Sequence, residues 1–341
     1  SGVATGVANS SSELCQTMLS ALGQMSEHLH DNPESDALML VPWSCTNCCS
    51  KSTGQLFSKE NANAILTIED MVYNKLIDTF KLAETIICGD VITQVACYLK
   101  GAGAGSSFKE LAQDLLNCIW QAYLGDGEGG LLDAALKIAS ETIVCNPVRE
   151  KRAAIAVVGN ANLTLSPILN NDIFDKIAVE GCNVVPPSLG TLAIHSALVY
   201  AQKLEDSKDG VISQYVDYLK NYQNRAAEEI KSAGLEYASC LSYDVIQKCA
   251  QSQGVDMNVL AGSGWTTQAT MFSLVKSGYY NILYAQTFAC LSNHVGGSAT
   301  FKDIRAFDSR ANIASIEYDA GISQVNQINR IKLLAALAKS K

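Results

Sequence analysis

Short apolar runs alternate along the chain with longer segments in which apolar residues recur every three or four positions. The runs end at glycine, proline or asparagine, which is typical of buried strands, and the longer segments have the period of amphipathic helices. Strands that alternate with helices indicate an α/β fold with a doubly wound parallel sheet. We predict strands at 153–158, 182–185, 257–260, 281–285 and 313–317, and helices at 171–179, through most of 191–249, after 262 as far as 276, and at 323–339.

The first part of the chain has a different pattern. Residues 37–42 (ALMLVP) predict one buried strand, and a cysteine cluster follows it. From 62 to 143 the period is helical, with long helix-forming runs at 107–124 and 131–144. We therefore expect an N-terminal α/β segment at 1–60, a helical insert or lobe at 61–150 and a C-terminal α/β lobe at 151–341. The predicted fold has two Rossmann- or flavodoxin-like lobes joined by the helical insert.

Composition narrows the classes of function. Hydrophobic residues make up 48% of the 341 positions and charged residues 17%, so the chain can bury a large core. The net charge of −9 disfavours nucleic acid as a partner, because phosphate binding needs a basic surface. We expect no membrane span, since no run of 18 apolar residues occurs, and no secretory signal, since a basic and then apolar start is missing. The chain is expected to be cytoplasmic, and its twelve cysteines are then expected to be reduced thiols, metal ligands or both.

The sharpest local signal is Cys45-x-x-Cys48-Cys49, directly after the first predicted strand. Thiolates at this spacing on a loop can face one metal ion or cluster, although a redox pair and packed thiols remain alternatives. A further ligand must come from a distant part of the chain. Cys290 is the natural candidate because it follows the strand predicted at 281–285, and Asn293 and His294 lie within one turn of it as residues that support the ligands.

The remaining cysteines and glycines give weaker signals. We predict small buried side chains for Cys88, Cys97 and Cys118, and we keep Cys145 and Cys182 as weaker ligand candidates, while Cys240 and Cys249 have no metal-like spacing. The loop Gly262-Ser263-Gly264-Trp265 lies between a predicted strand and a helix whose amino end can bind an anion or substrate. No Walker A motif is present, so ATP hydrolysis by this chain is not expected.

The C-terminal third also carries a family resemblance. The residues that carry it are Gly262–Thr266 and the segments 272–278, 281–282, 286–294 (QTFACLSNH), 318–326 (YDAGISQVN) and 329–330. A weaker similarity extends the resemblance over about 38–338. It is carried by 157–159, 170–171, 180–186 and the pair Gly54-Gln55. Together these residues resemble the family related to 2-hydroxyacyl-CoA dehydratases and their activases, specifically the iron–sulfur part without the ATPase domain.

The resemblance implies a [4Fe–4S] or double-cubane cluster held by cysteines from separate lobes. It also implies an ATP-hydrolysing activase that supplies a low-potential electron, and an oligomer with a like or related subunit. Cys290 matches one family ligand, and Cys48 or Cys49 matches another. With Cys45 as the third ligand, a fourth position would be open to a small molecule or a partner chain. The chain departs from the family at Asn160, where an acidic residue is usual, and at 100–103, where an Arg-Pro-Tyr-Glu-like stretch is usual.

The sequence therefore leaves three hypotheses about the function. The first is a low-potential reductase or dehydratase component, for which we expect a closed pocket at the Gly262–Trp265 loop. The second is a divergent, non-catalytic subunit or scaffold that packs against a catalytic homologue, with neither a full ligand set nor that pocket. The third is structural zinc on Cys45, Cys48 and Cys49, which predicts a colourless protein whose fold depends on zinc.

Overall fold

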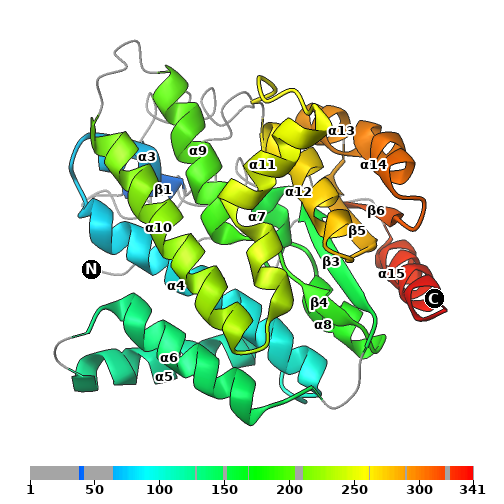
Figure 1. Cartoon of the computed structure of the whole chain (residues 1–341), viewed down its shortest axis with the longest axis horizontal. Helices are drawn as coiled ribbons and strands as arrows, with labels where there is room; N and C mark the ends of the chain where they lie inside the picture. Colours follow the sequence, from blue (N-terminus) through cyan, green and yellow to red (C-terminus); the bar gives the residue numbers. More distant parts are fainter. Residues whose placement is uncertain are drawn as a thin grey trace, which may run out of the picture.

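The computed structural model describes residues 38–41, 64–126, 129–148, 152–167, 169–203, 210–260, 262–288, 290–318 and 323–340. Its centre is a four-stranded, fully parallel sheet in the order β4-β3-β5-β6 (Figure 1). The strands are β3 (Ala154–Gly159), β4 (Asn183–Val185), β5 (Asn281–Thr287) and β6 (Asn312–Tyr318). The α/β class is confirmed, and so are the strands predicted near 153, 182, 281 and 313.

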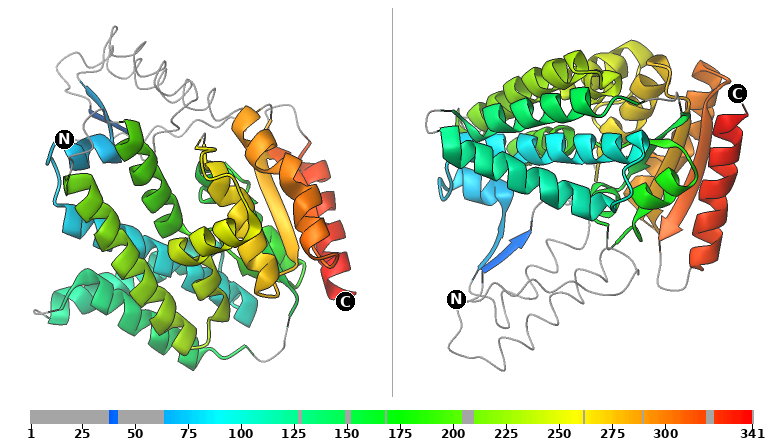
Figure 2. Two further views of the ribbon diagram at one scale, coloured as in Figure 1. Left: turned by 45° about the horizontal axis from the view of Figure 1, so that its top comes forward. Right: turned by 90° about the horizontal axis from the view of Figure 1, so that it is seen from below.

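Helices cover both faces of this sheet. On one face, α8 (Ile173–Val179) packs against α15 (Gln324–Lys339), and on the other α12 (Gly264–Lys276) packs against α14 (Phe301–Phe307) (Figures 1 and 2). Because both faces are covered, β3 and β5 are almost continuously buried, as the unbroken apolar runs predicted. The edge strand β6 is buried only at intervals.

The segment predicted to be helical from 62 to 143 is helical from Ile68 onward, but residues 64–67 form a strand, β2, instead of the start of a helix. It contains α3 (Ile68–Tyr73), α4 (Thr79–Ala102), α5 (Phe108–Asp126) and α6 (Leu131–Cys145). The C-terminal part adds α7 (Ala161–Thr164), α9 (Leu189–Lys203), α10 (Gly210–Ser232), the 3-10 helix η1 (Glu236–Leu241) and α11 (Tyr243–Gln253). The short α13 (Leu291–Gly296) and the 3-10 helix η2 (Ser298–Thr300) follow β5.

The long helix α4 joins these two parts of the chain. It packs against α5 and α6 on one side and against α9, α10 and β4 on the other, so its buried residues belong to the same core as the sheet. Length and composition make α4 the one described helix capable of spanning a membrane, but most of its apolar window is buried inside the protein. The same feature marks the core helix of a soluble protein.

A second, smaller parallel pair lies outside the main sheet. Strand β1 (Leu38–Val41) pairs with β2 (Ala64–Thr67), in the register Leu38 to Ala64 through Val41 to Thr67. The strand predicted at 37–42 is therefore confirmed. Cys45, Cys48 and Cys49 come between β1 and β2 and lie outside the described residues.

Two further predictions about local structure are wrong. Residues 257–260 form a turn rather than a strand, because the Asp256 carboxylate accepts a hydrogen bond from the Asn258 backbone N–H at 3.0 Å and closes the chain on itself. Cys118 is exposed, whereas Cys88 and Cys97 are buried as predicted. The buried positions of α5 are Phe108, Leu115 and Ile119, and Cys118 lies away from that stripe.

The contact that connects α4 to the sheet generates a prediction. Asp90 is buried and accepts hydrogen bonds from Ser188 Oγ (2.7 Å) and from the backbone N–H groups of Leu189 (3.0 Å) and Gly190 (3.2 Å). Asp90→Ala would leave these buried donors unpaired, so we expect a loss of about 3 kcal/mol in the free energy of unfolding. Urea denaturation followed by circular dichroism measures it.

The matched control is Asp78→Ala. Asp78 also accepts two backbone N–H groups, those of Phe80 and Lys81, but it caps the exposed amino end of α4. Loss of such a cap costs about 1 kcal/mol. Equal losses for the two variants would contradict the role of the buried Asp90 contact.

Candidate functional site

The candidate site lies at the carboxyl edge of the sheet, where the strand order reverses. The chain passes from β3 to β4 on one side and then crosses to β5 on the other side of β3. In open parallel sheets, ligands bind outside the carboxyl ends of the strands at such a switch point. The carboxyl ends of β3 and β5 lie close together here, because the Asn160 backbone N–H donates to the Ala285 carbonyl at 2.9 Å.

Gly159 and Asn160 allow this close approach. Gly159 has a φ of 141°, and a Cβ there would come within 1.9 Å of the Ala285 carbonyl oxygen. Asn160 follows it, and its Oδ1 accepts a hydrogen bond from the Leu163 backbone N–H at 3.3 Å. The residue before a helix commonly accepts such a hydrogen bond from a backbone N–H of the first turn, and asparagine and aspartate do so equally well.

Cys290 lies at the same edge, just after β5. It is the residue before α13, and its backbone carbonyl accepts from the His294 N–H at 3.0 Å. Its thiol is free and partly exposed, with Sγ 3.3 Å from the Ser292 hydroxyl. Exposed apolar side chains surround it in sequence: Phe288, Leu291 and Val295. The thiol is thus partly exposed, with apolar neighbours in the sequence and the Ser292 hydroxyl beside it.

The Gly262–Trp265 loop packs directly against the helix that follows Cys290. A Cβ at Gly262 would lie 2.8 Å from Ser292 Oγ, and one at Gly296 would lie 3.2 Å from the Gly264 carbonyl oxygen. Two segments singled out in the sequence, the glycine loop and the Cys290 turn, are therefore neighbours in space. The start of α12 and the start of α13 form one wall of the site.

Trp265 lies beneath this loop rather than on its surface. It is 3% exposed and contacts the rings of His195 and Tyr243 edge to face, with centroids 5.9 and 5.8 Å away. Its backbone N–H donates to the Val259 carbonyl at 2.8 Å. Trp265 therefore anchors the loop in the core, and Ser263 is the member of the loop that faces a cavity.

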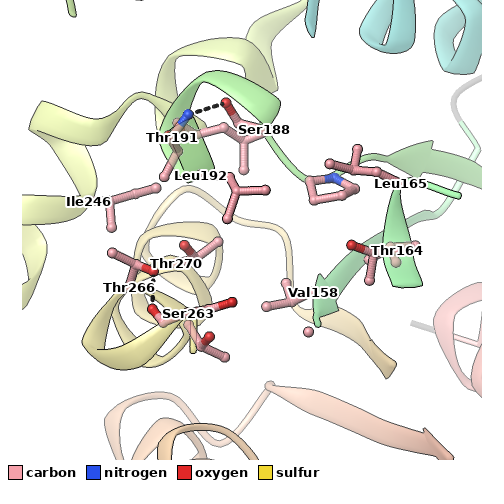
Figure 3. A pocket seen from close by; sticks show the side chains of 15 residues that line it. Val158, Thr164, Leu165, Ser188, Thr191, Leu192, Ile246, Ser263, Thr266 and Thr270 are labelled. Carbon is pink, nitrogen blue, oxygen red and sulfur yellow. Dashed lines mark hydrogen bonds between the residues drawn. The ribbon is translucent and has the colours of Figure 1, made fainter. Parts of the chain in front are cut away.

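That cavity has a volume of about 60 Å³, room for roughly two water molecules (Figure 3). Its walls come from the end of β3, from α7, from the loop after β4 and from α9 and α12, with one residue each from η1 and α11. Hydroxyl groups are frequent among its lining residues: Thr164, Ser188, Thr191, Ser263, Thr266, Thr267 and Thr270. Some of these hydroxyl groups donate hydrogen bonds within the protein. The Thr191 hydroxyl donates to the Leu241 carbonyl at 2.6 Å, and the Thr266 hydroxyl donates to the Ser263 carbonyl.

Asn293 and His294 lie on α13 in different surroundings. Asn293 is buried, its carbonyl accepts from the Tyr284 hydroxyl at 2.9 Å, and its Nδ2 has no partner in the part of the chain that the structure describes. His294 is exposed, with Nε2 3.9 Å from Glu317 Oε1. The Glu317 carboxylate is itself held by Gln286 Nε2 at 2.9 Å. His294 thus faces the end of β6.

The other cysteines are placed away from Cys290. Cys182 directly precedes β4 and Cys145 ends α6, ahead of β3, so both belong to the amino side of the sheet. A seven-residue strand such as β5 spans roughly 20 Å, which is too far for a shared metal. Burial raises the pKa of the Cys88 and Cys240 thiols to about 12, which keeps them protonated. Within the described ranges, no three potential metal ligands form a group.

Sequence reasoning missed several residues of this site. Ser188 and Thr191 follow the Pro186-Pro187 pair that ends β4, and a serine before a helical run is a recognisable start signal. His195 gave no signal, because its position beneath the glycine loop depends on how α9 packs on α12. No family model, no curated protein and no solved structure matches the chain, so the functional assignment rests on residues and geometry.

The conformation of Gly264 generates a prediction. Its φ is 52°, and a Cβ would come within 2.3 Å of the Val259 carbonyl oxygen. We expect Gly264→Ala to lower the free energy of unfolding by roughly 2 kcal/mol more than Gly254→Ala. Gly254 has a similar φ of 65°, but a Cβ there would have no atom within 4 Å, so it controls for backbone strain alone. Equal thermal shifts for both variants would show that the close contact is not a constraint.

His195 generates a prediction about pH. It is 2% exposed, its Nε2 has no hydrogen-bond partner among the described residues, and burial lowers its pKa to about 4 despite the nearby Gly262 carbonyl. The native state therefore binds fewer protons than the unfolded state below the usual histidine pKa of 6.5. Stability contributed by neutral His195 is complete above that value and is lost as the pH falls toward 4.

The measurement is urea denaturation of the wild type and His195→Gln. From about pH 7.5 to about pH 5, the wild type should lose roughly 2 kcal/mol more than the variant. A glutamine of similar size removes the titrating group, and each protein is compared with itself across pH. Identical pH dependence in the two proteins would exclude a buried neutral imidazole.

Proposed function

We propose that this chain is an iron–sulfur protein of the type related to 2-hydroxyacyl-CoA dehydratases, acting as a low-potential reductase or dehydratase component. The observation that carries the proposal is the position of Cys290. It presents a free, partly exposed thiol after β5 at the topological switch point, beside the Gly262–Trp265 loop. Residues 286–294 also belong to the part of the sequence after 255, in which the resemblance to that family is strongest.

Cys290 and one of Cys48 and Cys49 are the proposed primary ligands, with Cys45 as the third. The pair β1 and β2 supports a contribution from a second α/β lobe, because a parallel pair needs a crossover connection and the cysteine cluster lies in that connection. A cluster held in this way would supply low-potential electrons to a molecule bound at its open fourth position. An ATP-hydrolysing activase and a related subunit are the proposed partners, in the cytoplasm.

Few hydrogen-bond donors to the sulfurs and exclusion of water both lower the potential of a cluster. The side chains of Phe288, Leu291 and Val295 offer no donors but are exposed, and the Ser292 hydroxyl lies 3.3 Å from Cys290 Sγ. A low potential at Cys290 therefore requires that the proposed partner subunit covers these exposed side chains. Asn293 follows Cys290 by three residues, a spacing that faces the same side of a helix. We propose that Asn293 positions the Cys290 turn through its backbone carbonyl, which accepts from the Tyr284 hydroxyl at 2.9 Å.

The two departures from the family have structural tasks in this chain. Asn160 caps α7 through its hydrogen bond with the Leu163 N–H. Lys100 forms an ion pair of 2.8 Å with Asp175 and donates to the Ser106 carbonyl at 2.8 Å, and Gly103 ends α4 in a left-handed conformation. These roles support retention of the fold with a changed substrate, and the small cavity beside Ser263 is consistent with a small reacting molecule.

The test is anaerobic purification followed by iron, acid-labile sulfide and zinc analysis. We expect iron and sulfide in the wild type, and Cys290→Ser should lose most of the visible absorbance and bound iron. The matched control is Cys240→Ser, because the buried Cys240 Sγ contacts the Tyr237 carbonyl at 3.0 Å and a serine hydroxyl can donate to the same oxygen. Cys240→Ser should keep its iron.

The alternatives give different outcomes. Zinc without iron, together with unfolding by a chelator, would replace the proposal with the structural zinc site. Neither metal in anaerobically purified protein would support the non-catalytic subunit or scaffold. Unchanged iron content in Cys290→Ser would show that the ligands have been assigned wrongly.

A further inference from the structure

A second, much larger cavity lies at the opposite edge of the sheet. Its volume is about 770 Å³, and its lining includes Ala154, Asn183 and Asn281, the first residues of β3, β4 and β5. Cys290 and the glycine loop lie at the carboxyl ends of the same strands, so the two sites are separate. Cavities of roughly 300–1,000 Å³ are the usual size for small organic ligands.

The walls of this cavity are mainly aromatic and aliphatic. Four tyrosines line it, from the end of α4, from η1 and from the turn before β5: Tyr98, Tyr237, Tyr279 and Tyr280. Tyr237 and Tyr279 meet edge to face at 6.2 Å. The hydroxyls of Tyr98 and Tyr237 donate to the carbonyls of Asn146 (2.9 Å) and Gln94 (3.1 Å), which fixes both rings. Such walls suit a flat apolar group.

Two arginines line the same cavity with different partners. Arg310 is paired with the Asp308 carboxylate at 2.7 Å and lies over the Tyr280 ring at 4.2 Å. Arg152 forms no ion pair with any residue that the structure describes. A guanidinium is always charged and pairs with carboxylate or phosphate through two parallel hydrogen bonds. Among the described residues, Arg152 is therefore the cation of this cavity that has no acidic partner.

We propose that this cavity binds a flat organic anion, with an apolar ring against the tyrosines and a carboxylate or phosphate on Arg152. The proposal combines the volume, the four tyrosines of the walls and the Arg152 guanidinium, which has no ion pair among the described residues. Glu236 also lines the cavity, so the proposed anion binds at the Arg152 side and away from that carboxylate. The proposal does not depend on a cluster at Cys290, because the strands separate the two edges.

The test is isothermal titration calorimetry of the full chain with three rigid probes: 2-naphthoate, 2-naphthyl phosphate and the neutral 2-naphthamide. At least one anion should bind saturably, and 2-naphthamide should bind at least about tenfold more weakly. The tighter of the two anions identifies the natural headgroup as carboxylate or phosphate. This comparison uses only wild-type protein and so does not depend on the folding of any variant.

Variants locate the binding. Arg152→Gln should weaken the binding of the anion at least about tenfold and remove the preference over the amide. The control is Arg225→Gln, which removes an arginine that pairs with Asp133 and Glu229 outside the lining of this cavity and should change the affinity less than about threefold. Ala153→Phe, which fills the cavity, should abolish binding, and Cys290→Ser should bind like the wild type. No saturable binding of either anion up to about 1 mM, or unchanged affinity in Arg152→Gln or Ala153→Phe, would overturn the proposal.

Discussion

The amino end of α9 is held by the carboxylate of Asp90, a residue almost one hundred positions earlier in α4. Burial raises the pKa of this carboxyl, and its hydrogen bonds from Ser188, Leu189 and Gly190 lower it again in part. Gln223 of α10 extends the network, donating to Ser188 and Thr191 and accepting from the Tyr243 backbone N–H. Since α9 carries both Thr191 of the cavity wall and His195, the position of the glycine loop depends on this one buried carboxyl group.

The elements that the sequence predicts best are those whose signal is local and dictated by burial. The strands β3 and β5 are almost continuously buried because helices cover both faces of the sheet, and Cys290 follows β5 at the edge where ligands bind. The prediction at 257–260 fails for a local reason as well. An aspartate that closes a turn through its own side chain outweighs four residues of strand-like composition.

The parts of the site that sequence alone does not reveal are set by packing between distant segments. No pattern within α9 indicates that His195 lies against Trp265, or that Thr191 lines the same cavity as Thr164 and Ser263. Cys118 is a further example. Whether a cysteine of α5 is buried or exposed depends on which face of that helix packs against α4 and α6. The proximity of Gly262 to Ser292 likewise appears only when α12 and α13 are folded together.

The pairing of β3 with β5 also has a consequence for the order of assembly. Ile155 pairs with Asn281, so more than one hundred residues, mostly helical, separate the two central strands of the sheet. As the chain leaves the ribosome, α4, α6 and α9 can collapse around β3 and β4 well before β5 exists. Until then β3 has an open edge of unpaired backbone groups, the feature that promotes misassembly of growing chains. Completion of the sheet is therefore a late event with a large loop-closure cost, and slow folding follows from the strand order itself.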